Sequence, residues 1–329
     1  MKGALLFVVL LCLVKLPLSA QSVFTFIKTD WDTNYIDKFA THWSGRLYAV
    51  SKNQFFSITN RTSHEVVSFH PNSKAAIGLG ISYGNYAIDL GVNISNRKAD
   101  SLQSTKSFDL QSGIYTGQHV FDLSFQWYAG FFSSFQGPQA DTSTVLFRND
   151  IRTFNVGINY TYNFNYRRFS FNAPFIGTQI QKKSAGSPLA GVFVTYYDLR
   201  GNKSIIPAAA SNEFDEAAEI SEANLLTAGL IGGYAYTFVL PEHFTITLSL
   251  IPGLSFNIGD LKTSSYYNIG HPVTVSPKIV SKSAVGYEGK KFYSFLSYAI
   301  DGNFVNLGNK NQLNYNLSKF KFLVGYRIK

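Results

Sequence analysis

The chain has 329 residues, of which 16% are aromatic and 15% are charged, and its formal net charge is +9. Soluble domains carry about 25% charged residues, and no run of Lys or Arg here exceeds two residues, so neither an ordinary soluble enzyme nor a nucleic-acid-binding protein is indicated. Cys12 is the single cysteine, which excludes a disulfide framework and a cysteine-ligated metal site from the rest of the chain.

Residues 1–20 are predicted to form a cleaved signal peptide. Lys2 precedes an apolar run that extends from Ala4 to Val14, and Ser19-Ala20 supplies the small residues of a cleavage site after Ala20. No later stretch reaches the about 18 consecutive apolar residues that a transmembrane helix needs. Residues 21–44 are irregular and aromatic, so we predict a periplasmic lead-in there, followed by an all-β domain over residues 45–329.

Large apolar residues alternate with small or polar residues along most of this domain. The clearest example is residues 77–94, where two alternating segments meet at Gly84-Asn85, a pattern that predicts a β-hairpin. One face of the hairpin is entirely large and apolar, and the other carries glycine, asparagine and Asp89. Together with the few charges, the many aromatics and the signal peptide, this pattern predicts a single antiparallel transmembrane β-barrel in the outer membrane.

Fourteen strands are expected in the barrel. They lie at residues 46–57, 77–83, 86–94, 108–115, 119–132, 152–164, 169–181, 187–199, 203–209, 225–239, 244–258, 278–287, 292–304 and 315–328. The segment 203–209 is included because an odd number of strands would place the two termini on opposite sides of the membrane. If this segment and one neighbour are not membrane strands, the count is twelve.

The lengths of the connections predict which way the barrel faces. Outer-membrane barrels keep their periplasmic turns short, which assigns the turns at 84–85, 116–118, 165–168, 240–243 and 288–291 to the periplasm. Aromatic residues flank all of these turns and predict a girdle at that interface, namely Tyr83/Tyr86, Tyr115/Phe121, Phe164/Phe169, Phe238/Phe244 and Tyr287/Phe292. The acidic segment 212–222 is then an outer loop.

Five residues are candidates for a site. Asp89, Asp109 and Asp122 fall on the polar face of three consecutive predicted strands, so they could form an acidic patch in the lumen that favours cations or a basic group. The alternative is that they pair with inward Arg46 or Lys52 and fill the interior. Lys182 and Lys183 form a compact basic link that could contact anionic lipid, with a tight hairpin as the alternative.

No catalytic, cofactor or metal site is predicted. Ser82 lies in a G-x-S-x-G pattern, but this chemistry needs a turn between a strand and a helix, and here the serine sits in an alternating strand. We therefore expect a non-enzymatic pore or binder for a small solute or lipid. The alternatives are a structural or adhesive surface protein that acts through its loops and, less favoured, a membrane-embedded lipid-modifying enzyme. Expected partners are outer-membrane lipid, lipopolysaccharide and the barrel-assembly machinery, which would recognise the alternating last strand.

Several short segments resemble a known family. They are Asn34-Tyr35-Ile36, Arg46-Leu47-Tyr48, His70-Pro71-Asn72-Ser73, Arg168-Phe169-Ser170, Gln181-Lys182-Lys183-Ser184-Ala185-Gly186-Ser187 and Gly233-Tyr234-Ala235-Tyr236-Thr237. Through them the chain resembles the uncharacterised Bacteroidota outer-membrane barrels of domain of unknown function 4421. The resemblance implies an outer-membrane barrel of a Gram-negative bacterium, and it implies no activity or site residues.

Overall fold

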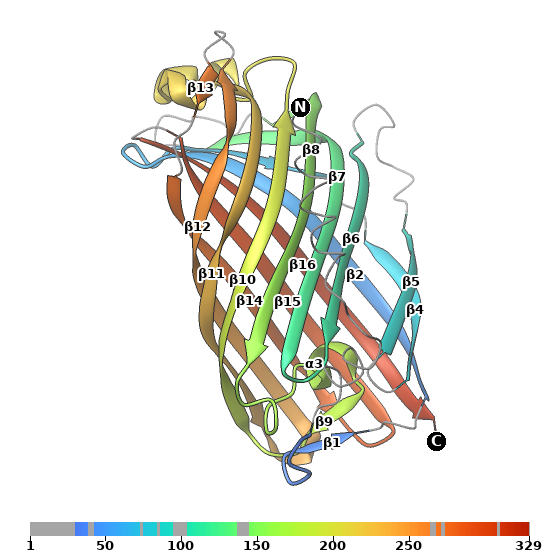
Figure 1. Cartoon of the computed structure of the whole chain (residues 1–329). Coiled ribbons are helices and arrows are strands. Elements are labelled where there is room, and N and C mark those ends of the chain that lie inside the picture. The colour runs from blue at the N-terminus through green and yellow to red at the C-terminus, as the bar shows by residue number, and fades with distance from the viewer. Residues whose placement is uncertain are drawn as a thin grey trace, which may run out of the picture. The chain divides into compact units, whose positions relative to one another are not determined.

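A computed structural model describes residues 30–38, 43–72, 75–83, 86–94, 104–136, 145–263, 268–270, 274–307 and 310–328. The expected signal peptide and most of the expected lead-in lie outside these residues. Trp31–Lys329 form one compact unit, built almost entirely of long antiparallel strands (Figure 1). None of the helices in the described part of the chain is long and apolar enough to cross a membrane.

Hydrogen bonds close ten of the strands into a ring. In chain order they are β2 (Trp43–Asn60), β3 (Val66–His70), β7 (His119–Gln136), β8 (Leu146–Asn163), β10 (Ala185–Arg200), β11 (Ile220–Val239), β12 (Phe244–Thr263), β14 (Thr274–Glu288), β15 (Phe292–Leu307) and β16 (Asn311–Ile328). The last strand, β16, pairs with β2 along its whole length and so joins the two ends of the sheet. The fold is that of an outer-membrane-type β-barrel.

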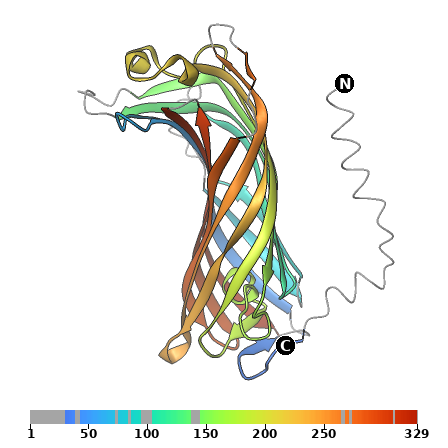
Figure 2. The same cartoon turned by 60° about the vertical axis from the view of Figure 1, so that its left-hand side comes forward.

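The two ends of the barrel differ. The start of β2, the end of β16 and the turns at 116–118, 240–243 and 289–291 lie at one end, which we call the short-turn end (Figure 1). The other end, the long-loop end, carries the 3-10 helices η1 (Ala208–Glu213) and η2 (Glu216–Ala218). The helix η2 falls within the acidic segment 212–222 that was expected to form an outer loop, and η1 overlaps only the start of that segment. Figure 2 shows both helices at the opposite end from α3 (Asn172–Ile176).

The wall between β2 and β7 changes along the barrel axis. Toward the long-loop end, β3 pairs with both β2 and β7 and closes the ring. Toward the short-turn end, β3 is replaced by three strands, β4 (Ala76–Tyr83), β5 (Tyr86–Asn93) and β6 (Lys106–Tyr115). Of these, β4 pairs with β2 and β5, whereas β6 pairs with β7.

Twelve of the fourteen predicted segments are strands of the barrel sheet, and two are not. Residues 169–181 contain Pro174, which cannot donate to a sheet ladder, and they form α3 and the short strand β9 (Gln179–Gln181), which pairs with β1 (Ile36–Lys38) outside the barrel sheet. Residues 203–207 form irregular, bent backbone that leads through Pro207 into η1, which contains residues 208 and 209. The strands β3 and β13 (Asn268–Gly270), which were not predicted, bring the described sheet to fourteen strands.

The outer face of the sheet is apolar and exposed. Leu79, Leu90 and Leu230 are 69%, 74% and 62% exposed, as expected for a wall that faces lipid chains. Tyr83, Phe164, Phe238, Phe244 and Phe292 are exposed near the short-turn end, in line with the expected aromatic girdle. Tyr115 and Phe169 were also expected in the girdle, and this prediction is wrong, because both side chains are buried in the interior. The side chain of Tyr86 lies outside the described residues.

Candidate functional site in the barrel interior

A segment of the chain fills the short-turn end of the barrel from inside. Residues 169–181, here called the plug, place Phe169, Phe171 and Ile176 in a buried cluster with Phe193 and Ile231 of the barrel wall. The plug is also tied to the wall through its backbone. Arg46 donates to the carbonyl of Ile176 at 2.7 Å, and Arg327 donates to the carbonyl of Gly177 at 3.0 Å.

A second segment fills the long-loop end. Residues 204–218, here called the cap, bury Ile205, Ile206 and Phe214 in a cluster that also contains Tyr197 and Tyr315. The rings of Tyr197 and Tyr315 stack with centroids 4.2 Å apart, from strands on different sides of the ring. Arg148 donates to the carbonyl of Ile205 at 3.2 Å. The chain's own residues therefore fill both ends of the interior and leave a polar middle.

Cross-strand ion pairs line this middle. Asp89 on β5 lies 2.7 Å from Arg46 on β2 and 2.6 Å from Lys321 on β16. A glycine, Gly80, makes room for this group, because a Cβ there would collide with the Asp89 carboxylate. The side chains of Asp89 and Lys321 point inward because successive residues of a strand face opposite sides, and the residues next to them are apolar and lie on the outer face.

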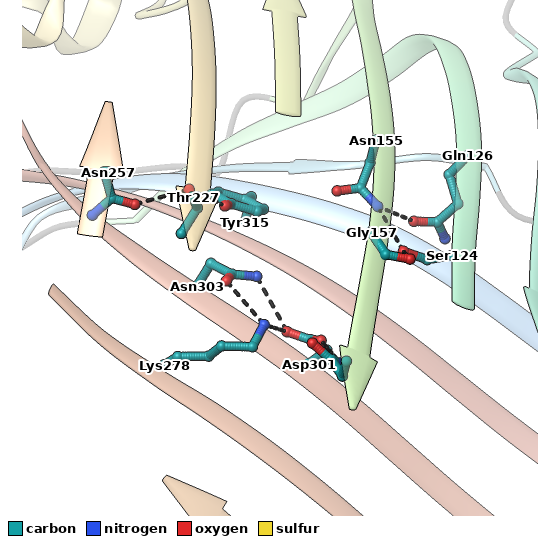
Figure 3. Close-up of polar contacts among 11 residues, drawn as sticks. Ser124, Gln126, Asn155, Gly157, Thr227, Asn257, Lys278, Asp301, Asn303 and Tyr315 are labelled. Atoms are coloured by element: carbon teal, nitrogen blue, oxygen red, sulfur yellow. Dashed lines mark hydrogen bonds and ion pairs between the residues drawn. The ribbon is translucent and has the colours of Figure 1, made fainter. Parts of the chain in front are cut away.

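Two further carboxylates are each held by a buried lysine. Asp122 on β7 lies 2.5 Å from Lys282 on β14, and Tyr115 donates to the same carboxylate at 3.2 Å. Asp301 on β15 forms an ion pair with Lys278, and Asn159 donates to it at 2.6 Å. Figure 3 shows Lys278 between Asp301 and Asn303, with the separate polar contacts of Asn155 and Thr227 toward the long-loop end.

A cavity of about 290 Å³ lies among these groups. Its charged lining consists of five cations and three carboxylates, namely Arg46, Lys52, Lys282, Lys319 and Lys321 with Asp89, Asp122 and Asp301. The lining of the cavity therefore carries excess positive charge. The apolar part of the lining includes Val50, Leu110 and Ile176. A cavity with this lining suits an anionic group with an apolar body.

Lys319 is the exceptional member of the lining. Its Nζ has no hydrogen-bond or ion-pair partner among the residues that the structure describes, although the other cations of the cavity each have one. Lys319 lies directly opposite Lys52 in the pairing of β16 with β2. Lys52 in turn donates to the backbone carbonyl of Asp109 at 3.2 Å.

The three predicted aspartates are all on the inner side of the wall, and the cavity brings two of them together. Asp89 and Asp122 line it, whereas Asp109 does not. The carboxylate of Asp109 accepts from Gln126 and from Tyr128, each at 2.6 Å. The pairing of Asp89 with Arg46 is the one that the alternative interpretation named, and the charges of Asp89 and Asp122 are balanced by cations.

The sequence interpretation missed the lysines that define the cavity, Lys282, Lys319 and Lys321. A signal for two of them exists, because Phe320 and Phe322 face outward, so that Lys319 and Lys321 must face inward. Pairs of lysines at inward positions of a strand are therefore a useful signal in such chains. No set of three or more side chains suited to hold a metal ion occurs in the described part of the chain.

The basic link at 182–183 lies outside the barrel interior. Lys182 donates from Nζ to the carbonyl of Thr33 at 2.8 Å, and Lys183 lies over the ring of Tyr35 at 5.6 Å. Both lysines are exposed. They hold the N-terminal segment against the short-turn end, and their contact with anionic lipid stays a prediction.

Comparisons with known proteins give a family and a set of distant barrels. The family model described as "Domain of unknown function (DUF4421)" matches residues 30–328. No curated protein matches the chain. The chain is similar to the outer membrane protease OmpT from Escherichia coli, with 9% identity, a TM-score of 0.37 and coverage of 90% of this chain and 100% of that one.

Two further solved structures are more distant in TM-score. The outer membrane protein OprG from Pseudomonas aeruginosa has 13% identity and a TM-score of 0.24, with coverage of 90% of this chain and 99% of that one. The Pseudomonas putida toluene transporter TodX has 8% identity and a TM-score of 0.27, with coverage of 88% and 90%.

Proposed function

The chain belongs to the family described as domain of unknown function (DUF4421), and we propose that it is an outer-membrane barrel that binds a small anionic group in its filled interior. In this proposal the barrel neither catalyses a reaction nor conducts ions. The observation that carries it is Lys319, whose ammonium faces the cavity and has no hydrogen-bond or ion-pair partner among the described residues.

The charges around Lys319 support an anionic occupant. Like charges directly opposite each other on neighbouring strands are destabilising, and Lys319 faces Lys52 in this way. The carboxylates of the cavity lining are paired with other cations, because Asp89 bonds Arg46 and Lys321, Asp122 bonds Lys282, and Asp301 bonds Lys278. An anion between Lys52 and Lys319 would remove the repulsion and form charge-assisted hydrogen bonds, the strongest kind available to an ammonium.

The filled ends favour a binder over an open channel. Porins conduct because their lumen is water-filled, whereas here apolar clusters of the plug and the cap occupy the two ends. The exposed apolar wall supports a place in the outer membrane, with the short-turn end toward the periplasm. Contacts with lipopolysaccharide and with the barrel-assembly machinery remain proposals of the same kind.

The test measures anion binding by the purified full-length barrel in detergent micelles. Inorganic phosphate and decyl phosphate serve as probes, and titration calorimetry gives their affinities. We expect the Lys319→Met variant to bind about tenfold more weakly, because one charge-assisted hydrogen bond is lost. The control is Lys310→Met, which removes the same charge from an exposed position at the long-loop end.

Three outcomes would overturn the proposal. The first is that neither probe binds the wild-type barrel, and the second is that Lys319→Met and Lys310→Met bind equally well. The third is steady single-channel conductance of the wild-type protein in planar bilayers, which would support an open pore instead. Each variant is first shown to be folded by its heat-modifiable mobility in gel electrophoresis.

A further inference from the structure

The barrel wall is interrupted between two consecutive strands. In the described residues, β5 pairs only with β4 and β6 pairs only with β7, so that the facing edges of β5 and β6 share no ladder. Consecutive strands usually pair. The strand β3 bridges β2 and β7 only toward the long-loop end, so the interruption opens toward the short-turn end. We call it the seam.

The seam lies in the part of the wall that faces lipid. Next to it, Ile88 and Leu90 on β5 are 63% and 74% exposed, and Phe108 and Ile114 on β6 are 56% and 51% exposed. Unpaired backbone groups are not tolerated against hydrocarbon unless they are buried in protein or line a water-filled cavity. The unpaired backbone groups of the two edges are therefore explained if the seam opens into the polar interior of the barrel.

The cavity reaches both edges of the seam. Its lining includes Ala87 and Asp89 from β5 and Gln111, Ser112 and Gly113 from β6. Among the described residues, no hydrogen bond or ion pair joins the two edges to each other. Instead, cations of the cavity hold each of them.

The cations that hold the edges are the neighbours of Lys319. Asp89 on the β5 edge is bound by Arg46 and Lys321, and the backbone carbonyl of Asp109 on the β6 edge accepts from Lys52. Lys52 lies opposite Lys319, and Lys321 is two residues from it along β16. An anion that bound Lys319 would thus compete for the same ammonium groups that restrain the two edges.

We propose that the seam is a lateral portal through which a membrane-resident anionic amphiphile places its headgroup among Lys52, Lys319 and Lys321 while its acyl chain remains in the bilayer. The inference rests on the proposed function, because it names the class of ligand and the route to the same cations. At about 290 Å³ the cavity has room for a headgroup and the first methylenes beside Val50 and Leu110. The rest of a longer acyl chain must leave the barrel. The seam offers it an exit, because there the lining of the cavity meets the lipid-facing wall.

The test closes the seam covalently. The double variant Ile88→Cys with Ile114→Cys places one thiol on the outer side of each edge, and neither residue lines the cavity. A flexible bis-maleimide joins the thiols, and mass spectrometry confirms the bridge. The control is Ile81→Cys with Ile88→Cys, since Ile81 and Ile88 are directly opposite in the paired hairpin β4–β5. The native Cys12 belongs to the expected signal peptide and is replaced by serine in both variants.

The readout is the uptake of radiolabelled decyl phosphate from nanodisc bilayers, with inorganic phosphate as the tail-free probe. We expect the bridged seam to lose most of the decyl phosphate uptake and the bridged control to retain it. Equal uptake by both bridged proteins would overturn the portal. So would decyl phosphate binding no tighter than inorganic phosphate, which would leave the proposed function intact. Failure of both probes in the wild-type protein would instead overturn the proposed function.

A second measurement does not depend on the bridge. Decyl phosphate with a diazirine near the end of its chain is photolysed in the wild-type barrel, and the labelled peptides are identified. We expect label on residues 86–92 and 108–114, which flank the seam, and less label after competition with unlabelled decyl phosphate. Label confined to the outer faces of β10, β11 and β12, on another side of the barrel, would overturn the portal.

Discussion

Lys282 on β14 and Asp122 on β7 lie 2.5 Å apart across the interior, although their strands are not neighbours in the sheet. The Lys282 side chain is 8% exposed, and Tyr115 bonds both partners. A buried ion pair adds little net stability over an apolar pair, because the desolvation of both charges opposes their attraction. Its effect here is geometric, since it fixes the separation of two walls and so the width of the cavity.

The Lys282–Asp122 pair gives the first prediction. Asp122→Asn leaves a buried ammonium without its counter-charge and is expected to destabilise the barrel by about 3–5 kcal/mol. The double variant Asp122→Asn with Lys282→Met removes both charges and should recover most of that loss. Denaturant unfolding in lipid vesicles, followed by tryptophan fluorescence, measures both. Equal losses in the single and double variants would show that the pair does not act as a unit.

Lys319 gives a second prediction, in which the substitution increases the stability of the barrel. Because Lys319 faces Lys52 across the β16–β2 pairing, Lys319→Met removes a like-charge contact and is expected to stabilise the ligand-free barrel by up to about 1 kcal/mol. Decyl phosphate should then stabilise the wild-type barrel more than the variant. The same unfolding assay checks both effects, with Lys310→Met as the control. A variant that is less stable without ligand would contradict the repulsion.

The barrel itself could be predicted from the sequence, because one physical pattern specifies it. Alternation of apolar and polar residues follows directly from the two faces of a strand, and it located twelve strands of the sheet. Residues 169–181 misled the interpretation because Phe169, Phe171 and Phe175 also alternate with other residues. They pack inside the barrel around α3 and do not form part of the wall.

The site was less accessible to sequence reasoning, since it depends on which strands pair. The hairpin at 77–94 and the strand at 106–115 have ordinary alternation, and nothing in either segment indicates that β5 and β6 leave their edges free. Likewise, the inward lysines of β14 and β16 come near Asp122 and Asp89 only through barrel closure. Alternation indicates the face of a residue, and the closed fold determines its partners.

Gly177 gives a third prediction, about the plug. It ends α3 with a φ of 80°, and a Cβ there would press on the ring of Tyr293. Gly177→Ala therefore strains the backbone by about 1–2 kcal/mol and should loosen the plug. We expect transient conductance steps in planar bilayers, where the wild-type barrel is silent. Gly232→Ala is the matched control, because a Cβ at that exposed wall position meets only ordinary contacts. Silence of the Gly177 variant would contradict the role of the plug as a barrier.

Glu65 gives a fourth prediction, at the long-loop end outside the membrane-spanning strands. It is buried in the turn between β2 and β3, and burial, together with the neighbouring carboxyl of Glu213 in the cap, raises the pKa of Glu65 above its ordinary value. A pKa that is higher in the folded state means that folding favours the protonated carboxyl. The resulting stability is present below the unfolded pKa and is lost as the pH rises through the folded pKa.

The cap should therefore be held more tightly at acid pH than at neutral pH. Hydrogen exchange of residues 205–218, corrected for the intrinsic rates, measures this difference. Glu65→Gln keeps the side chain neutral, so residues 205–218 should be strongly protected from exchange at both pH values. Glu242→Gln, at the short-turn end, should show the same pH dependence as the wild type. Because protonation of Glu65 lets its carboxyl bond Glu213 rather than repel it, protection that increases toward neutral pH would contradict the predicted sign.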